Sequence, residues 1–180
     1  LVLVDAPLAV PDVRGKRDAE QVLAWLDIPA FPVTPQRMAK VHGGARGPAL
    51  AERLRQEGHI VAEAIPDQVL RQLMWEQEHP EGSPPIGLGA YRRAWLGVRA
   101  PAFRPRGGRA RNDGLAPARA ILTGAMDAAA WPPADREGDL ADLDEAAVID
   151  AVACAALARR CIEGRQSTWA RIGTRDAGCI

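Results

Sequence analysis

Three acidic residues stand where a folded domain could bring them to one site. Asp5 ends the branched aliphatic run 1–4, which is typical of a strand buried on both faces. Glu63 lies in a second short apolar stretch, and Asp150 lies among small apolar residues of a long helical stretch. Converging carboxylates form a hard oxygen site of the kind that holds Mg²⁺ or Mn²⁺. Since paired ions of this type hydrolyse phosphodiesters, the acids predict that chemistry, with Asp5 and Asp150 as metal ligands.

Each acid also has an interpretation without catalysis. Asp5, followed closely by Pro7, fits a turn in which the carboxylate accepts a hydrogen bond from its own backbone. Asp150 needs a partner, because burying a carboxylate costs several kcal/mol unless it is paired or binds a metal, and an arginine such as Arg17 could be that partner. Glu63 could lie on an exposed sheet edge. These alternatives stay open from the residues alone.

The segment 92–111 is strongly basic, with seven arginines and no acid. Guanidinium groups bind phosphates in pairs of hydrogen bonds, and the neighbouring aromatic residues could stack on bases. The segment therefore predicts a nucleic-acid-binding surface made by Arg92, Arg93, Arg104, Arg106 and Arg109. Its prolines and glycines predict a largely irregular backbone. The alternative is a solvated loop that balances the acidic linker 131–146.

Other catalytic patterns are weak or missing in this sequence. The three histidines have no metal-ligand spacing, and the "GLG" at 87–89 lacks the third glycine of a dinucleotide motif. There is no GxxxxGK[ST] phosphate loop and no GxSxG nucleophile elbow. Cys154 and Cys161 lie on one helix face and are interpreted as core residues.

Helices with apolar faces are expected to position the acids. Hydrophobic spacing predicts helices over 17–26, 48–57, 67–77, 117–130 and 142–164. For the last helix, Asp142 and Glu145 have capping-box spacing, and Gly164 is expected to end it. The strand-like stretches are 1–4 and 59–66, and the prolines at 29 and 32 predict an extended loop.

Composition indicates one folded domain, spanning 1–180. Hydrophobic residues make up 47% and charged residues 26%, as in ordinary globular proteins, and 23 basic residues balance 23 acidic ones. Three cysteines without CxxC spacing argue against a disulfide framework and favour a cytoplasmic location. No membrane span or signal peptide is predicted, and the sequence leaves the oligomeric state open. Because residue 1 already lies inside a strand, we expect strands upstream of it.

The ordered set of motifs resembles a known family. The runs "VDAPLAVP", "GKRDAE", "VAEAIPD", "YRRAWLGV" with "RPRGGRARNDGL", and "VIDAVACAALARR" occur in the order found in the predicted RNase H-like nucleases catalogued as domain of unknown function 429. The resemblance covers nearly the whole chain. It implies an α/β, RNase H-like fold, in which a mixed five-stranded sheet and a late helix gather acids around divalent metal.

The resemblance also implies roles for single residues. Asp5 looks like the acid of the family's D-[AI]-P strand, Glu63 like that of its E-x-x-P strand, and Asp150 like its helix aspartate. The family's first strand, with a further aspartate, is not among residues 1–180, and Ala146 and Ala147 stand where many members have acids. The sequence thus predicts a metal-dependent nuclease; the alternative is a non-catalytic RNase H-like module that binds nucleic acid or a protein partner.

Overall fold

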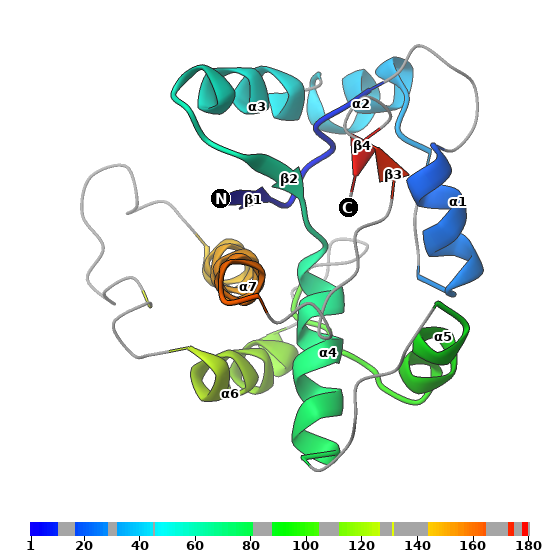
Figure 1. Ribbon diagram of the computed structural model, residues 1–180, viewed down its shortest axis with the longest axis vertical. Helices are drawn as coiled ribbons and strands as arrows, with labels where there is room; N and C mark the ends of the chain where they lie inside the picture. The colour runs from blue at the N-terminus through cyan, green and yellow to red at the C-terminus, as the bar shows by residue number, and fades with distance from the viewer. Residues whose placement is uncertain are drawn as a thin grey trace.

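The computed structural model describes residues 1–10, 17–28, 32–44, 46–80, 88–104, 112–126, 131, 144–164, 173–174 and 178–179. The fold is predominantly helical, with a small parallel sheet packed against helices (Figure 1). The elements in chain order are β1 (Val2–Val4), α1 (Asp18–Trp25), α2 (Pro35–His42), α3 (Arg46–Gln56), β2 (Val61–Glu63), α4 (Pro66–Glu78), α5 (Leu88–Leu96), a 3₁₀ turn (Asn112–Gly114), α6 (Leu115–Ala125), α7 (Glu145–Ile162), β3 (Gly173–Thr174) and β4 (Gly178–Cys179). The strands and helices of the predicted α/β class are thus present, with helices in the majority.

The parallel pair β1–β2 is the sheet that carries the acids. Val2 pairs with Val61 and Val4 with Glu63, so two strands far apart in the sequence lie in register. The pairing extends past the strand ends, where the Ala64 amide donates to the Val4 carbonyl at 3.0 Å. Pro7 follows shortly and cannot donate to a ladder, which agrees with the early end of β1. β3 and β4 form a separate antiparallel pair.

The main core lies between three helices. α7 packs against α4, α6 and β1, and the buried side chains of these helices form one apolar cluster. Leu70 of α4, Leu122 of α6 and Ile149 of α7 are fully buried in it. Figure 1 shows α7 beside α4 and α6, below the sheet. The sheet therefore packs against the helical layer through α7, the helix that carries Asp150.

Two glycines let backbone segments approach closely. A side chain at Gly47, in α3, would place its Cβ 2.2 Å from the Pro7 carbonyl oxygen. A side chain at Gly114 would place its Cβ 2.3 Å from the Ala102 carbonyl oxygen. Only glycine fits such contacts without displacing backbone. The first contact supports the loop after Asp5, and the second supports the segment that carries Arg104.

The structure corrects several sequence-based expectations about the elements. Residues 88–96 form a helix, α5, although the basic segment was predicted to be largely irregular from residue 92. α2 was not predicted; Thr34 begins it by accepting a hydrogen bond from the Arg37 amide at 3.2 Å. The N-cap of α7 is Asp144, which accepts from the Ala147 amide at 2.7 Å, and not Asp142, which lies outside the described residues. Gly164, with φ of 71°, follows the end of α7 as expected.

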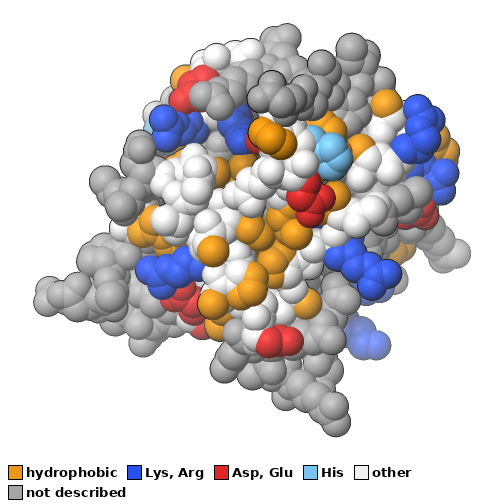
Figure 2. Space-filling model, turned by 90° about the horizontal axis from the view of Figure 1, so that it is seen from below, with side chains coloured by type: hydrophobic (Ala, Val, Ile, Leu, Met, Phe, Trp, Pro, Cys, Tyr) orange, Lys and Arg blue, Asp and Glu red, His pale blue; other side chains and the backbone are white. Residues whose placement is uncertain are grey.

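Among the described residues, no helix is long and apolar enough to span a membrane. Figure 2 shows the face on the side of α4, α5 and α6, where hydrophobic side chains form a central band. Arginine and lysine side chains lie at separate places around that band, interspersed with acids. On this face the described basic residues therefore form no single patch.

Candidate functional site

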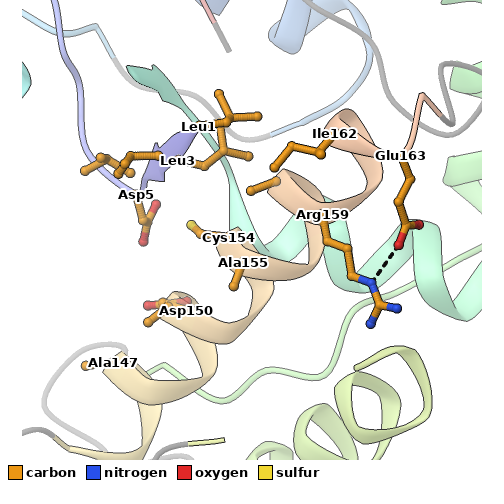
Figure 3. Close-up of a pocket in the computed structure, with 14 residues that line it drawn as sticks. Leu1, Leu3, Asp5, Ala147, Asp150, Cys154, Ala155, Arg159, Ile162 and Glu163 are labelled. Carbon is orange, nitrogen blue, oxygen red and sulfur yellow. Dashed lines mark hydrogen bonds and ion pairs between the residues drawn. The ribbon is translucent and has the colours of Figure 1, made fainter. Parts of the chain in front are cut away.

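Asp5 lies directly after β1, at the carboxyl end of a parallel strand. Ligands of open α/β sheets bind at this end. Figure 3 shows Asp5 pointing toward α7, and Leu1 and Leu3 line the same groove. The alternation of side chains along a strand places these odd-numbered residues on one face. Asp5 is thus presented to the helix that carries Asp150.

Asp150 lies in the second turn of α7, on the side that faces β1. Its neighbours on this side of the helix are small: Ala147, Ala151 and Cys154 line the same groove. Small side chains allow the helix to approach the strand closely, and the Asp150 side chain keeps only 19% of its surface exposed. The helix and the strand end therefore bring the two acids to one place.

Arg104 joins the two acids. Its Nη2 atom donates to Asp150 Oδ1 at 2.6 Å and to Asp5 Oδ2 at 2.8 Å, while Nε donates to Asp150 Oδ2 at 3.1 Å. Both carboxylate oxygens bind one nitrogen, so they lie no farther apart than the sum of the first two distances. The predicted proximity of Asp5 and Asp150 is confirmed. The predicted alternative also applies in part, because Asp150 pairs with an arginine, although with Arg104 instead of Arg17.

Asp67 is a third acid at this site, and the sequence did not single it out. Its Oδ2 atom lies 4.0 Å from Arg104 Nη1, at the first turn of α4. A signal was available, because Asp67 follows Pro66 directly after β2, and the first turn of a helix favours an acid. Three carboxylates therefore surround one guanidinium group.

Burial and the like charges nearby raise the pKa values of Asp5 and Asp150. The pKa of Asp5 is raised to about 6, chiefly by burial, while Arg104 lowers it and the charges of Asp150 and Asp67 raise it. Burial also raises the pKa of Asp150, against the hydrogen bond and charge of Arg104. For Arg104, burial lowers the pKa, but the bond to Asp150 and the charges of Asp5 and Asp150 raise it overall. Folding therefore destabilises the charged forms of Asp5 and Asp150, and a bound cation would stabilise these forms.

Cys154 lies beside the acids but is not a nucleophile. Burial, together with the charges of Asp5 and Asp150, raises the pKa of its thiol to about 12. A thiol in this environment stays protonated and unreactive at neutral pH. Its interpretation as a packing residue agrees with its burial.

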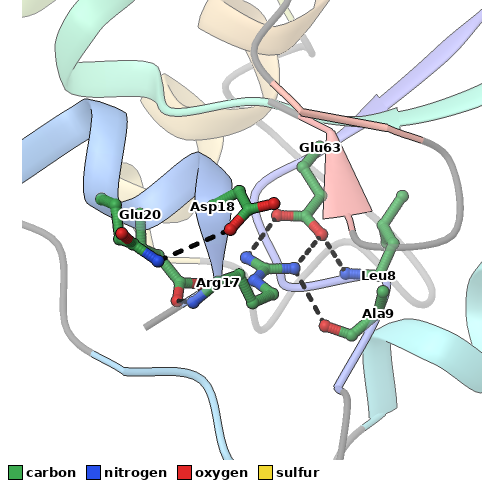
Figure 4. Close-up of polar contacts among 7 residues, drawn as sticks. Leu8, Ala9, Arg17, Asp18, Glu20 and Glu63 are labelled. Atoms are coloured by element: carbon green, nitrogen blue, oxygen red, sulfur yellow. Dashed lines mark hydrogen bonds and ion pairs between the residues drawn. The ribbon is translucent and has the colours of Figure 1, made fainter. Parts of the chain in front are cut away.

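Glu63 does not join Asp5 and Asp150, which corrects the expectation of three converging acids. Its side chain is buried and binds Arg17, whose Nη1 and Nη2 donate to the two carboxylate oxygens at 2.7 and 2.9 Å (Figure 4). Glu63 Oε1 also accepts from the Leu8 amide at 2.8 Å. The physical reason is register: Glu63 pairs with Val4, so it shares the face of Val4 and not that of Asp5. The alternative of an exposed sheet edge is also wrong, since 6% of Glu63 is exposed.

The Arg17–Glu63 pair organises the loop that follows Asp5. Arg17 Nη1 donates to the Ala9 carbonyl at 2.9 Å, and Glu63 holds the Leu8 amide. Glu20 accepts from the Arg17 amide and side chain, so the arginine is bound on two sides (Figure 4). Glu63 therefore fixes the backbone that follows Asp5, although its side chain lies on the opposite face of the sheet.

The predicted nucleic-acid-binding arginines have different environments. Arg104 belongs to the acid site, as described above. Arg92 donates to Asp27 at 2.8 Å and stacks over Trp25 at 5.6 Å from the ring centroid. Arg93 is exposed on α5. Arg106 and Arg109 lie outside the described residues.

A groove of about 810 Å³ separates β1 from α7. Residues 1–5 line one side, and α7 lines the other with small apolar side chains and, at its far end, Ile162 (Figure 3). Asp5 and Asp150 stand at one end of the groove, and the ion pair of Arg159 with Glu163 stands at the other. The two acids thus lie at one end of a mostly apolar groove.

The acid pair fits one divalent ion in its donor chemistry. Mg²⁺ binds proteins through one or two carboxylates and keeps several waters, and Asp5 and Asp150 supply that number of ligands. Arg104 Nη2 occupies the point that both carboxylates reach, so an ion bound between them would replace it. In the part of the chain that the structure describes, no three His, Cys, Asp or Glu side chains are arranged to hold a metal. The predicted three-acid site is therefore absent from that part.

The chain was compared with protein-family models, with curated proteins and with solved structures. No family model, curated protein or solved structure matches it.

Proposed function

We propose that this chain is an RNase H-like domain that hydrolyses phosphodiester bonds with Mg²⁺ or Mn²⁺. The observation that carries the proposal is that Asp5 and Asp150 meet at a single nitrogen of Arg104. A strand-end acid and a helix acid brought to one point form the kind of hard oxygen site that divalent metals bind. The ordered motifs that resemble the predicted RNase H-like nucleases give the same residues as candidates.

The residues divide the work as follows. Asp5 and Asp150 would hold the ion, and Asp67 would raise the negative charge beside it. A divalent ion held there supplies activation of water and stabilisation of the leaving oxygen. Arg104, displaced from the acids by the ion, would bind a phosphate of the substrate, and Arg92, Arg93, Arg106 and Arg109 would extend that contact along a nucleic-acid strand.

A second candidate function is a non-catalytic module that binds nucleic acid or a protein partner. One specific observation favours it: Arg104 already binds both acids through three hydrogen bonds. A carboxylate pair bound to its own arginine is a complete structural ion pair, and such a pair requires no metal.

A cleavage and binding experiment separates the two functions. The 180-residue chain is incubated with labelled single-stranded and duplex DNA and RNA, with Mn²⁺ and with chelator, and binding is measured separately by fluorescence anisotropy. The metal-dependent function predicts cleavage only with Mn²⁺, loss of cleavage in Asp150→Asn, and unchanged binding. Glu52→Gln, which alters an exposed acid on α3, is the matched control and should cleave like the wild type.

Cleavage that persists in Asp150→Asn would contradict the nuclease proposal. Binding without cleavage by the wild type, across the whole panel, would favour the non-catalytic module. Absence of both binding and cleavage would contradict both nucleic-acid functions, would leave the basic segment as a solvated loop, and would leave a protein partner as the ligand of the non-catalytic module.

A further inference from the structure

The guanidinium of Arg104 lies between the acid pair and a third acid, Asp67. Its Nε and Nη2 atoms form one edge of the planar group and donate to Asp150, and Nη2 also donates to Asp5. Its Nη1 atom donates no hydrogen bond within the described residues and lies 4.0 Å from Asp67 Oδ2. Since a hydrogen bond needs about 3 Å, a movement of about 1 Å would form one here. Arg104 therefore has a second carboxylate acceptor within reach.

The backbone that carries these two side chains is fixed. Phe103, directly before Arg104, is 2% exposed and lies in the main core, and the close approach of Gly114 supports the same segment. Asp67 directly follows Pro66, which is fully buried at the start of α4. The charged side chains themselves are only partly covered, at 35% exposure for Arg104 and 36% for Asp67. The arginine side chain can thus change acceptors while both backbone segments stay in place.

The charges of the site favour such a change when a divalent ion binds. Three carboxylates surround one guanidinium, so negative charge is in excess. A divalent ion at Asp5 and Asp150 would be balanced by these two acids, and it would repel the guanidinium at short range. Arg104 and Asp67 then remain as one positive and one negative group. Pairing of these two groups would leave both halves of the site neutral.

We propose that Asp67 receives Arg104 when a divalent ion binds Asp5 and Asp150. The inference rests on the proposed function, because it concerns the same metal site. Asp67 is a positioning residue: it holds the displaced guanidinium beside the ion through Nη1, and the Nε–Nη2 edge becomes available to a phosphate of the substrate. Without Asp67, the displaced arginine would lose its acceptors without replacement, and the ion would bind more weakly.

A double-mutant cycle on metal affinity tests this exchange of acceptors. Isothermal titration calorimetry measures Mn²⁺ binding, without nucleic acid, to the 180-residue chain, Asp67→Asn, Arg104→Gln and the double variant. We expect the loss of affinity caused by Asp67→Asn to be at least about threefold larger in the wild type than in the Arg104→Gln background, because the two residues form a contact in the metal-bound state. Loss of a charge alone would weaken Mn²⁺ binding in both backgrounds.

A control variant and a structure complete the test. Asp18→Asn also removes an acid from the first turn of a helix, α1, outside the acid site, and it should bind Mn²⁺ like the wild type. Circular dichroism and the melting temperature check that every variant folds. In a crystal structure of the chain with Mn²⁺, the distance between Arg104 Nη1 and Asp67 Oδ2 should fall from 4.0 Å to about 3 Å.

Two results would overturn the exchange and leave the proposed metal site intact. The first is a loss from Asp67→Asn that is no larger in the wild type than in the Arg104→Gln background, which would make Asp67 a distant charge or a direct ligand. The second is a Mn²⁺-bound structure in which Arg104 still binds Asp150 or turns to solvent. Mn²⁺ binding only after removal of Arg104 would likewise show that the arginine is not displaced. Absence of Mn²⁺ binding in all four proteins would contradict the exchange and the metal site together.

Discussion

The guanidinium of Arg17 and the carboxylate of Glu63 form a buried, two-pronged ion pair, with N–O distances of 2.7 and 2.9 Å. Both side chains are almost fully shielded from solvent, at 3% and 5% exposure. The pair ties the start of α1 to the end of β2. Because Glu63 also holds the Leu8 amide, the pair fixes the loop that leaves Asp5.

We expect Arg17→Met to destabilise the protein by about 3 to 5 kcal/mol, because it leaves a buried carboxylate without its partner. Urea unfolding measures the change in the free energy of unfolding. The double variant Arg17→Met with Glu63→Met removes both charges and should recover part of that loss. If the double variant is as unstable as the sum of the two single changes, the two side chains do not interact.

We expect Arg104→Gln to bind Mn²⁺ about tenfold more tightly than the wild type, a change of about 1.4 kcal/mol. The reason is that Arg104 occupies the point between Asp5 and Asp150 that a metal would take. Isothermal titration calorimetry measures the affinity, and Arg93→Gln on α5 is an exposed control. Weaker Mn²⁺ binding in Arg104→Gln would show that the arginine orders the acids for the metal instead of competing with it.

Stability should depend on pH through Asp5. Its pKa is raised from 3.8 to about 6 on folding, chiefly by burial, so between these values the folded chain binds more protons than the unfolded chain. The contribution of Asp5 to stability is therefore fully present below about pH 4 and is lost as pH rises through about 6. Unfolding by urea at pH 4.5 and pH 7 should show a smaller pH-dependent decrease in Asp5→Asn than in the wild type. Equal pH dependence in both proteins would contradict the raised pKa of Asp5.

Gly47→Ala should destabilise the protein by about 1 to 3 kcal/mol, because the added methyl group would overlap the Pro7 carbonyl and displace the loop after Asp5. Gly89 is a matched control, since each glycine is the second residue of its helix and a Cβ at Gly89 meets only the flexible end of Arg93, at 3.9 Å. Gly89→Ala should be neutral or stabilising. Thermal unfolding compares the two variants, and equal melting temperatures would argue against the close contact at Gly47.

Local pattern predicted much of the fold and part of the site. The helices that became α1, α3, α4, α6 and α7 were expected from hydrophobic spacing, with ends shifted by a few residues. The proximity of Asp5 and Asp150 followed from two local facts, an acid at a strand end and an acid among small residues on a helix. In α5, the number of arginines concealed a helical spacing of apolar residues.

Partners of the acids could not be predicted, because they depend on register and on loop paths. The side of the sheet that Glu63 faces is decided by its pairing with Val4, and a shift of one residue would have reversed it. Arg104 binds Asp150 from an irregular segment, and the spacing of apolar residues does not predict the path of such a segment. Arg17 was one alternative partner for Asp150, yet it binds Glu63, on the opposite face of the sheet.

The distance along the chain between Asp5 and Asp150 has a consequence during protein synthesis. Ribosomes add about 5 to 20 residues per second, so Asp150 is made roughly 7 to 30 s after Asp5. The partner of β1 in the sheet, β2, is made much earlier, and so are Arg17 and Glu63. A nascent chain can therefore form the sheet and its buried ion pair before α7, which packs against the side of β1 beside Asp5, has been synthesised. Whatever the acids do, they cannot do it together until the ribosome has completed that helix.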